Sequence, residues 1–169
     1  MIAVNEALKH IETQTSTLGT QTLPLLAARG SILASAVQSP INMPPFRQSA
    51  MDGYAIQLNG TPEYNVINES KAGDSGNWSL KSAEAVRIFT GALVPDDADT
   101  VVIQEHVERA ADKIHINKLP QKGSNIRPIG AQVFAGTEVL KKGTLVNEAT
   151  IGFLAGLGIQ EIEVYKKPK

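Results

Sequence analysis

The sequence contains no cysteine among its 169 residues. A chain without thiols forms no disulfide and offers neither a cysteine nucleophile nor a cysteine-ligated metal site. Charge of one sign is also lacking, because 16 basic residues nearly balance 17 acidic ones and leave a net charge of −1. Nucleic-acid binding depends on an excess of basic side chains, so we expect no nucleic-acid partner.

Long hydrophobic runs are absent too. The longest, over residues 151–159, is too short to cross a bilayer. The first ten residues do not show the basic stretch followed by an apolar stretch that a secretion signal requires. We therefore expect a cytoplasmic protein without a membrane partner.

The usual signatures of nucleotide and metal sites are missing as well. Neither glycine-rich phosphate-binding pattern occurs. His10, His106 and His115 show no metal-ligand spacing, and we assign them no role. The acidic cluster at residues 96–99 has two interpretations, a divalent-cation site or a solvated turn after Pro95, and the turn is favoured.

The N-terminal part of the chain has a helical pattern. Apolar residues at helical spacing predict a helix that begins near Val4 and ends near Thr15. A weaker pattern predicts a second helix over residues 25–33, with Leu26, Ile32 and Leu33 facing inward.

From Pro40 the pattern changes to short alternating runs separated by turn residues. These runs predict five strands, at residues 54–58, 64–66, 85–89, 100–105 and 113–117. Residues 72–77 are expected to form a loop, and residues 110–112 a hairpin connection. Short strands of this kind close most easily as an antiparallel barrel or sandwich, because closure removes exposed edges.

The C-terminal part is mixed again. Extended pieces are expected at residues 138–140 and 144–146, followed by a helix with Asn147 as its N-cap and Gly158 at its C-terminal end. A strand is expected at residues 161–165.

These patterns predict an α+β fold with two lobes. Residues 1–45 and 133–169 are expected to form a discontinuous, elongated α/β lobe. Residues 46–132 are expected to form an antiparallel, β-barrel-like lobe inserted into it. The insertion follows because neither end of the chain has enough strands to cover its own apolar faces.

The most informative segment is Ser49-Ala-Met-Asp52-Gly-Tyr-Ala55, which follows two prolines that stiffen the chain. It places a carboxylate directly before Gly53, and we expect this glycine to let the backbone turn sharply. A turn with no further role is the simplest interpretation of such an Asp-Gly pair.

This segment resembles the signature of MoeA-type molybdopterin molybdenumtransferases, a family that includes the gephyrin E domain. The likeness extends to four further motifs in order, which are Arg87-Ile-Phe-Thr90-Gly91-Ala92-Leu-Val-Pro95, Asp99-Thr-Val-Val-Ile-Gln104-Glu105, Asn125-Ile-Arg127-Pro-Ile-Gly130 and Ala135-Gly136-Thr-Glu-Val-Leu. It covers the whole chain, but family members continue beyond it, so the resemblance implies an N-terminal fragment consisting of the family's first and second domains.

The resemblance implies a function in molybdenum cofactor biosynthesis. The parent enzyme would insert molybdate into adenylylated molybdopterin and release AMP, acting as a homodimer with a composite active site at the subunit interface. Mg²⁺ would be bound mainly by the C-terminal domain that this chain lacks. The molybdopterin adenylyltransferase is the implied protein partner, and the isolated fragment is expected to be inactive.

The resemblance also implies roles for five residues of this chain. Asp52 and Thr90 match catalytic positions, and Ser49, Gly91 and Arg127 match substrate-binding positions. No metal ligand is implied. An ionised aspartate offers only acceptors, threonine is a small donor and acceptor, and arginine provides a fixed fork for an oxyanion such as molybdate or phosphate.

The chain departs from the family pattern at two places. Residues 130–132 read Gly-Ala-Gln where the family usually has Gly-Glu-Asp, and Arg47-Gln48 replace Asp-Asn. Both changes make the local charge more positive, which alters the field that an anion would meet. Two hypotheses therefore stand, a molybdenum-insertion enzyme and a non-catalytic assembly or scaffold module of the same family.

Overall fold

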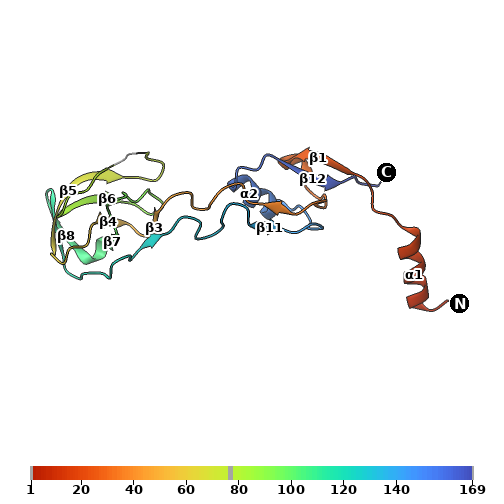
Figure 1. Cartoon of the computed structure of the whole chain (residues 1–169), viewed down its shortest axis with the longest axis horizontal. Coiled ribbons are helices and arrows are strands. Elements are labelled where there is room, and N and C mark those ends of the chain that lie inside the picture. The colour runs from red at the N-terminus through yellow and green to blue at the C-terminus, as the bar shows by residue number, and fades with distance from the viewer. Residues whose placement is uncertain (1, 76–77, 169) are drawn as a thin grey trace. The chain divides into compact units, whose positions relative to one another are not determined.

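The computed structural model describes residues 2–75 and 78–168 (Figure 1). The chain divides into two compact units, one made of Met1–Ile41 with Ala135–Lys169 and the other of Asn42–Phe134. Part of the loop expected at residues 72–77 lies outside the described residues, because residues 76 and 77 are not among them.

The first unit combines helices with two short antiparallel ladders. Its elements are α1 (Val4–Gln14), β1 (Thr20–Pro24), the 3-10 helix η1 (Leu25–Ala28), β2 (Val37–Gln38), β11 (Glu138–Leu140), α2 (Glu148–Gly156) and β12 (Glu161–Tyr165). Strand β1 pairs with β12, and β2 pairs with β11. The core between them consists of buried aliphatic residues from both ends of the chain, namely Leu25, Ala28, Leu33, Val146, Leu154, Ile162 and Val164.

The predicted C-terminal helix and strand are confirmed. Asn147 caps α2, because its side-chain oxygen accepts from the Thr150 backbone N–H at 2.9 Å. Gly158 follows the helix with φ 79°, a left-handed conformation that glycine adopts without strain. Strand β12 covers the predicted residues and buries its alternate side chains.

The second predicted helix is wrong. Only η1 forms, and Gly30 then takes φ 71° while its N–H donates to the Val146 carbonyl. Residues 31–33 pair instead with the C-terminal part of the unit. The expected inward side chains separate accordingly, since Leu33 is fully buried whereas Leu26 is 81% exposed. The piece expected at residues 144–146 is likewise an isolated bridge to Ile32, not a strand.

Helix α1 forms where its periodicity predicts, but none of its residues is buried. Its apolar stripe is open, with exposed fractions of 75% for Val4, 53% for Leu8 and 59% for Ile11.

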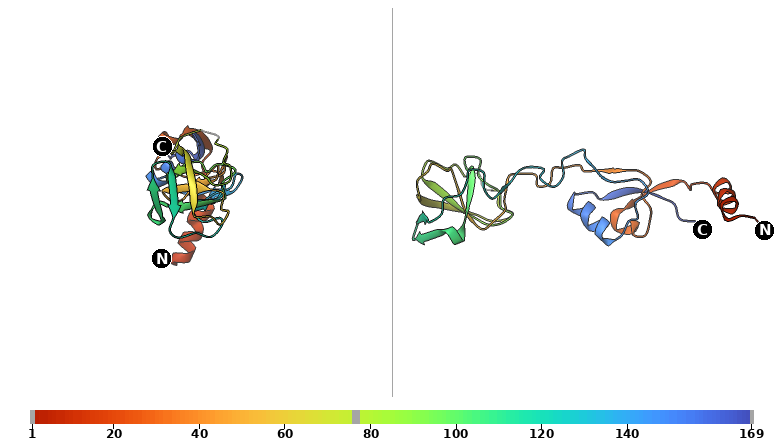
Figure 2. Two further views of the ribbon diagram at one scale, coloured as in Figure 1. Left: turned by 90° about the vertical axis from the view of Figure 1, so that its left-hand side faces the viewer. Right: turned by 90° about the horizontal axis from the view of Figure 1, so that it is seen from below.

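The second unit is built on one six-stranded sheet. Its elements are β3 (Gln48–Ser49), β4 (Gly53–Ile56), β5 (Glu63–Ser70), β6 (Glu84–Ile88), β7 (Thr100–Ile103), the 3-10 helix η2 (Gln104–His106), β8 (Val107–Ala110), β9 (Lys113–Ile116) and β10 (Ile126–Arg127). The strand order in the sheet is β7-β4-β6-β5-β9-β8, and β3 pairs separately with β10. Figure 2 shows the sheet curling over itself.

This topology corrects the predicted antiparallel barrel in two respects. Strands β5 and β6 are parallel, because the long connection between them carries the chain back to the end of the sheet at which β5 begins. The sheet is also an open half-barrel, since its end strands β7 and β8 do not pair with each other in the described part of the chain. With its two α-helices and several sheets, the described chain has a mixed α/β fold.

Strand β4 is the centre of this unit. Its four residues are all buried, which departs from the alternation expected for residues 54–58. The reason is that β4 lies between β6 and β7 and is covered on both faces. Ala55 belongs to a cluster on one face, while Tyr54 and Ile56 belong to a second cluster on the other.

Gly53, the first residue of β4, must be glycine because the backbone of β7 approaches it closely, and not because the chain turns there. Its φ does not lie in the left-handed region. A Cβ built on Gly53 would lie 1.8 Å from the Val102 carbonyl oxygen and 2.8 Å from its carbon. These are backbone atoms of β7 that cannot rotate away, so no residue with a side chain fits here without moving β7.

We expect Gly53→Ala to destabilise the second unit by about 1–3 kcal/mol, the range for forcing extra atoms into a packed site. Trp78, the single tryptophan of the chain, packs against a core cluster of this unit and reports its unfolding by fluorescence in urea. The control is Gly152→Ala in α2, where an added Cβ meets nothing within 4 Å. An unchanged urea midpoint for Gly53→Ala would contradict the close-approach account.

Candidate functional site

Asp52 lies directly before β4 and is held on two sides. Its Oδ1 accepts hydrogen bonds from the Thr90 backbone N–H and from the Thr90 hydroxyl, both at 2.8 Å. Its backbone carbonyl accepts from the Gln104 N–H at 3.0 Å. The two predicted catalytic residues, Asp52 and Thr90, are therefore in direct contact.

Strand register explains why these distant residues meet. Gly53 pairs with Ile88 near the end of β6 and with Ile103 at the end of β7. The chain segments that leave β6 and β7 consequently lie beside the residue that enters β4. Thr90 and Gln104 reach Asp52 for this reason.

The Asp52 carboxyl is held in its ionised form. Its pKa lies below the ordinary value of 3.8, chiefly because the Thr90 backbone N–H donates to it. The Thr90 hydroxyl and the positive charge of Arg87 lower the pKa further. The second carboxylate oxygen, Oδ2, accepts from no group in the part of the chain that the structure describes. The site thus presents a half-buried anionic acceptor in a fixed orientation.

Ser49 and Gly91 shape the backbone beside this pair. Gly91 takes φ 88° and donates its N–H to the Ser49 carbonyl at 2.9 Å. The Ser49 side chain is fully buried, and its hydroxyl donates to the Met51 carbonyl at 2.7 Å. A hydroxyl committed in this way supports the segment that carries Asp52 and does not face solvent.

Arg127 is joined to the site only through its strand. It pairs with Gln48 in the short β3–β10 ladder, next to the pairing of Ser49 with Ile126. Its side chain is exposed and touches neither Asp52 nor Thr90. Among the described residues no partner holds its guanidinium, which leaves the fork available to an anion.

Sequence reasoning missed Arg87. This residue stands in β6 opposite Tyr54 of β4, and its guanidinium lies over the rings of Tyr54 and Phe89 at 5.2 and 4.5 Å from their centroids. It donates to the Gly53 carbonyl at 2.8 Å and to the Gln104 side-chain oxygen at 2.6 Å. The signal in the sequence is its place at the head of the motif that contains Thr90 and Gly91, but only the strand register brings it to Asp52.

The structure shows the surroundings of both departures from the family pattern. The Arg47 guanidinium donates to the backbone carbonyls of Pro95, Asp96 and Ala98, so its charge is used to fix a loop. At the other departure the shared Gly130 takes φ 71° under the Phe134 ring, and the departing residues Ala131 and Gln132 donate their backbone N–H groups to the Pro128 and Met43 carbonyls.

The acidic cluster at residues 96–99 anchors loops. Asp97 accepts from the Ser79 hydroxyl and the Leu80 N–H, and Asp99 accepts from the Leu58 N–H and pairs with Lys122 at 3.2 Å. No group of three or more His, Asp or Glu side chains suited to a metal ion occurs among the residues described. The donor set of this chain alone therefore does not fit the Mg²⁺ that the resemblance implies, and we derive no step through that ion.

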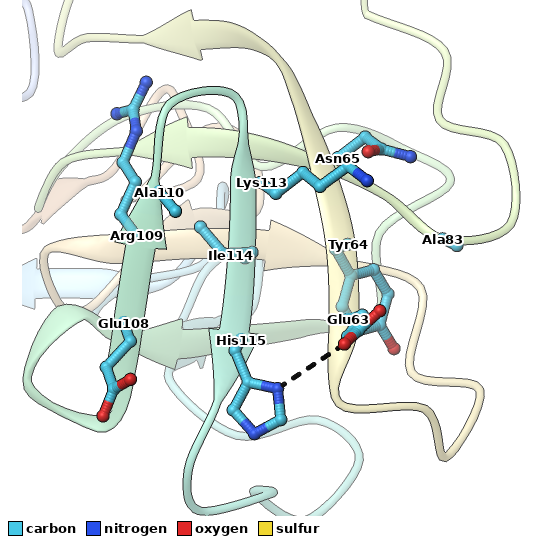
Figure 3. Close-up of a pocket in the computed structure, with 10 residues that line it drawn as sticks. All are labelled: Glu63, Tyr64, Asn65, Ala83, Glu108, Arg109, Ala110, Lys113, Ile114 and His115. Atoms are coloured by element: carbon cyan, nitrogen blue, oxygen red, sulfur yellow. Dashed lines mark ion pairs between the residues drawn. The ribbon is translucent and has the colours of Figure 1, made fainter.

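A separate shallow pocket of about 540 Å³ lies across β5, β9 and β8 (Figure 3). Its walls carry charges of both signs, and Glu63 and His115 face each other there at 4.0 Å. None of the five predicted site residues lines it. It lies where β5 begins, beside the start of β6, whereas β4 begins beside the end of β6.

No helix in the described part of the chain is long and apolar enough to span a bilayer.

Together these features define a chain in which a half-barrel unit, carrying an Asp–Thr pair at the entry to its central strand, interrupts a discontinuous α/β unit in sequence. The sequence profile described as MoeA N-terminal region (domain I and II) matches residues 2–158. The chain belongs to this family.

Individual relatives agree with this placement. The chain is 39% identical over 154 residues to a molybdopterin molybdenumtransferase of Haemophilus influenzae, covering 89% of this chain and 38% of the relative. It is 35% identical over 175 residues to the protein of the same name from Staphylococcus aureus, covering 99% of this chain and 42% of the relative.

The fold agrees with a solved structure as well. The crystal structure of the molybdopterin biosynthesis moeA protein from Pyrococcus horikoshii matches with a TM-score of 0.92 and 32% identity, over 99% of this chain and 47% of that one. The chain therefore spans less than half the length of the relatives it matches.

We expect Thr90→Val to raise the pKa of Asp52 toward its ordinary value of 3.8, because the variant loses the hydroxyl donor. A lowered folded-state pKa stabilises the fold above pH 3.8, and this contribution is lost as the pH falls through the folded pKa. The stability difference between wild type and Thr90→Val should therefore shrink in acid. ¹³C carboxyl NMR measures the titration, and Thr90→Ser, which keeps the hydroxyl, is the control. Identical Asp52 titrations in wild type and Thr90→Val would show that the Thr90 hydroxyl does not lower the pKa of Asp52.

Proposed function

We propose that the protein to which this chain belongs acts in molybdenum cofactor biosynthesis and inserts molybdate into adenylylated molybdopterin with release of AMP. In this proposal the chain supplies one side of a composite active site at a homodimer interface. The observation that carries it is the Asp52–Thr90 pair, which holds an ionised, half-buried carboxylate in a chain whose relatives are named molybdopterin molybdenumtransferases.

The geometry supports particular roles for these residues. Asp52 uses Oδ1 on Thr90 and keeps Oδ2 for a donor on the substrate, such as an N–H or O–H group of a pterin. A carboxylate with a lowered pKa is a poor proton donor at neutral pH, so Asp52 orients the substrate as an acceptor. Thr90 holds Asp52 in place, and the exposed Arg127 fork suits molybdate or phosphate oxygens.

A composite site is proposed because these side chains do not supply all the groups that the reaction needs. The lowered pKa of Asp52 makes it a weak base toward the Thr90 hydroxyl that donates to it, and no cluster suited to Mg²⁺ accompanies the pair in the described part of the chain. The remaining groups would come from the rest of the parent protein and from a second subunit. The molybdopterin adenylyltransferase, which would supply the adenylylated substrate, is the expected protein partner.

A second candidate is a non-catalytic assembly or scaffold module. The specific observation that favours it is the segment at residues 130–132, where the uncharged Ala131 and Gln132 stand in place of an acidic pair. The open apolar stripe of α1 is compatible with the same role. Under this hypothesis the Asp52–Thr90 contact would serve the fold alone.

In the full-length parent, we expect Asp52→Asn and Thr90→Ala to lower cofactor synthesis by about 10- to 100-fold, the effect of losing one charge-assisted hydrogen bond. Their melting temperatures should fall by only a few degrees, because Thr90 is exposed and Asp52 half-buried, so the lost hydrogen bonds lie outside the core. The assay follows cofactor formed from adenylylated molybdopterin, Mg²⁺ and molybdate. Asp112→Asn, in the turn between β8 and β9, is the matched control and should keep full activity.

The isolated 169-residue chain is included in the same assay and should form no cofactor above background. Cofactor formation by the isolated chain would contradict the composite site. Full activity of either site variant, or loss only through unfolding, would contradict the site assignment and favour the scaffold hypothesis.

A further inference from the structure

The side chain of Arg87 connects three strands whose ends lie beside Asp52. It belongs to β6, and its two terminal nitrogens donate to the Gly53 carbonyl of β4 and to the Gln104 side chain at the start of η2. Gly53 follows Asp52 in sequence, and the Gln104 N–H donates to the Asp52 carbonyl. Arg87 therefore holds Gly53, which follows Asp52 in the chain, and Gln104, which is hydrogen-bonded to the Asp52 backbone.

The environment of Arg87 makes this connection rigid. The guanidinium lies over the Tyr54 and Phe89 rings, and Tyr54 is buried in a core cluster. Such stacking fixes the plane of the guanidinium, which is weakly hydrated and therefore loses little on leaving water. The side chain is thereby held at the end of the core, between the aromatic rings and the site.

Arg87 acts on Asp52 through other groups. Both terminal nitrogens of its fork already donate to protein oxygens, Nη1 to the Gly53 and Ile88 carbonyls and Nη2 to the Gln104 side chain, so these bonds fix the guanidinium within the protein. It also forms no ion pair with the Asp52 carboxylate, whose Oδ1 is bonded to Thr90. A direct ligand role therefore belongs to Asp52 and Arg127, not to Arg87.

We propose that Arg87 is the positioning residue of the Asp52–Thr90 site, tying the ends of β4, β6 and β7 into one frame that presents the free carboxylate oxygen in a fixed direction. That this oxygen binds a ligand rests on the proposed function. The positioning role of Arg87 is independent of that function, because it can be tested on the Asp52 carboxylate without a substrate.

The test compares Arg87→Met and Arg87→Lys with the wild-type chain by NMR. One readout is hydrogen exchange at the Thr90 and Gln104 amides, which donate to Asp52. The other is the ¹³C titration of the Asp52 carboxyl. Arg109→Met is the control, because Arg109 is an exposed arginine of β8 whose side chain, among the described residues, donates to the nearby Ala111 carbonyl alone.

We expect Arg87→Met to accelerate exchange at both amides by about tenfold, the equivalent of one lost hydrogen bond, and to raise the Asp52 titration midpoint. Arg87→Lys keeps the charge but lacks the fork, so exchange should accelerate as in Arg87→Met while the midpoint stays closer to wild type. The control should match wild type in both readouts.

Wild-type exchange in a folded Arg87→Met variant would overturn the proposal. So would full restoration of slow exchange by lysine, since charge alone would then suffice. Should Arg87→Met fail to fold, Arg87→Lys decides on the same exchange readout. Because no ligand is involved, a failed activity assay for the proposed function leaves this result unaffected.

Discussion

The approach of β4 to β7 at Gly53 is the constraint on which the second unit depends. A Cβ at this position would overlap the Val102 carbonyl at 1.8 Å, so the two backbones meet only because the residue has no side chain. The same residue pairs with Ile88 of β6. The ends of three strands are thus brought to the residue before Gly53, and that residue is Asp52.

The chemistry of the site follows from this backbone arrangement. Thr90 arrives from β6 and supplies two donors to one carboxylate oxygen, while Gln104 arrives from β7 and holds the Asp52 backbone. These donors stabilise the ionised carboxyl and fix its direction, and Arg87 ties the segments together. The site is therefore organised by hydrogen bonds to and from the backbone, with an anionic acceptor left facing outward.

Local signals in the sequence predicted those features that depend on neighbouring residues. The cap of Asn147 and the alternation of β12 are of this kind, and the ordered motifs identified the family before any geometry was known. Features that depend on distant partners differ from the prediction: Gly53 is required by its neighbour in β7 and not by a turn, β5 and β6 are parallel, and the local pattern does not point to Arg87. In each case the cause is a cross-strand neighbour that periodicity does not reveal. The lobe boundaries at residues 45/46 and 132/133 and the roles of the five site residues stay predictions.

The most direct test of the central claim is a crystal structure of the full-length parent protein with adenylylated molybdopterin and molybdate bound. We expect a substrate donor within hydrogen-bond distance of Asp52 Oδ2, with the Thr90 contacts to Oδ1 unchanged. A substrate bound in a site that leaves Asp52 and Thr90 facing bulk solvent would contradict the claim that this pair is one side of the active site.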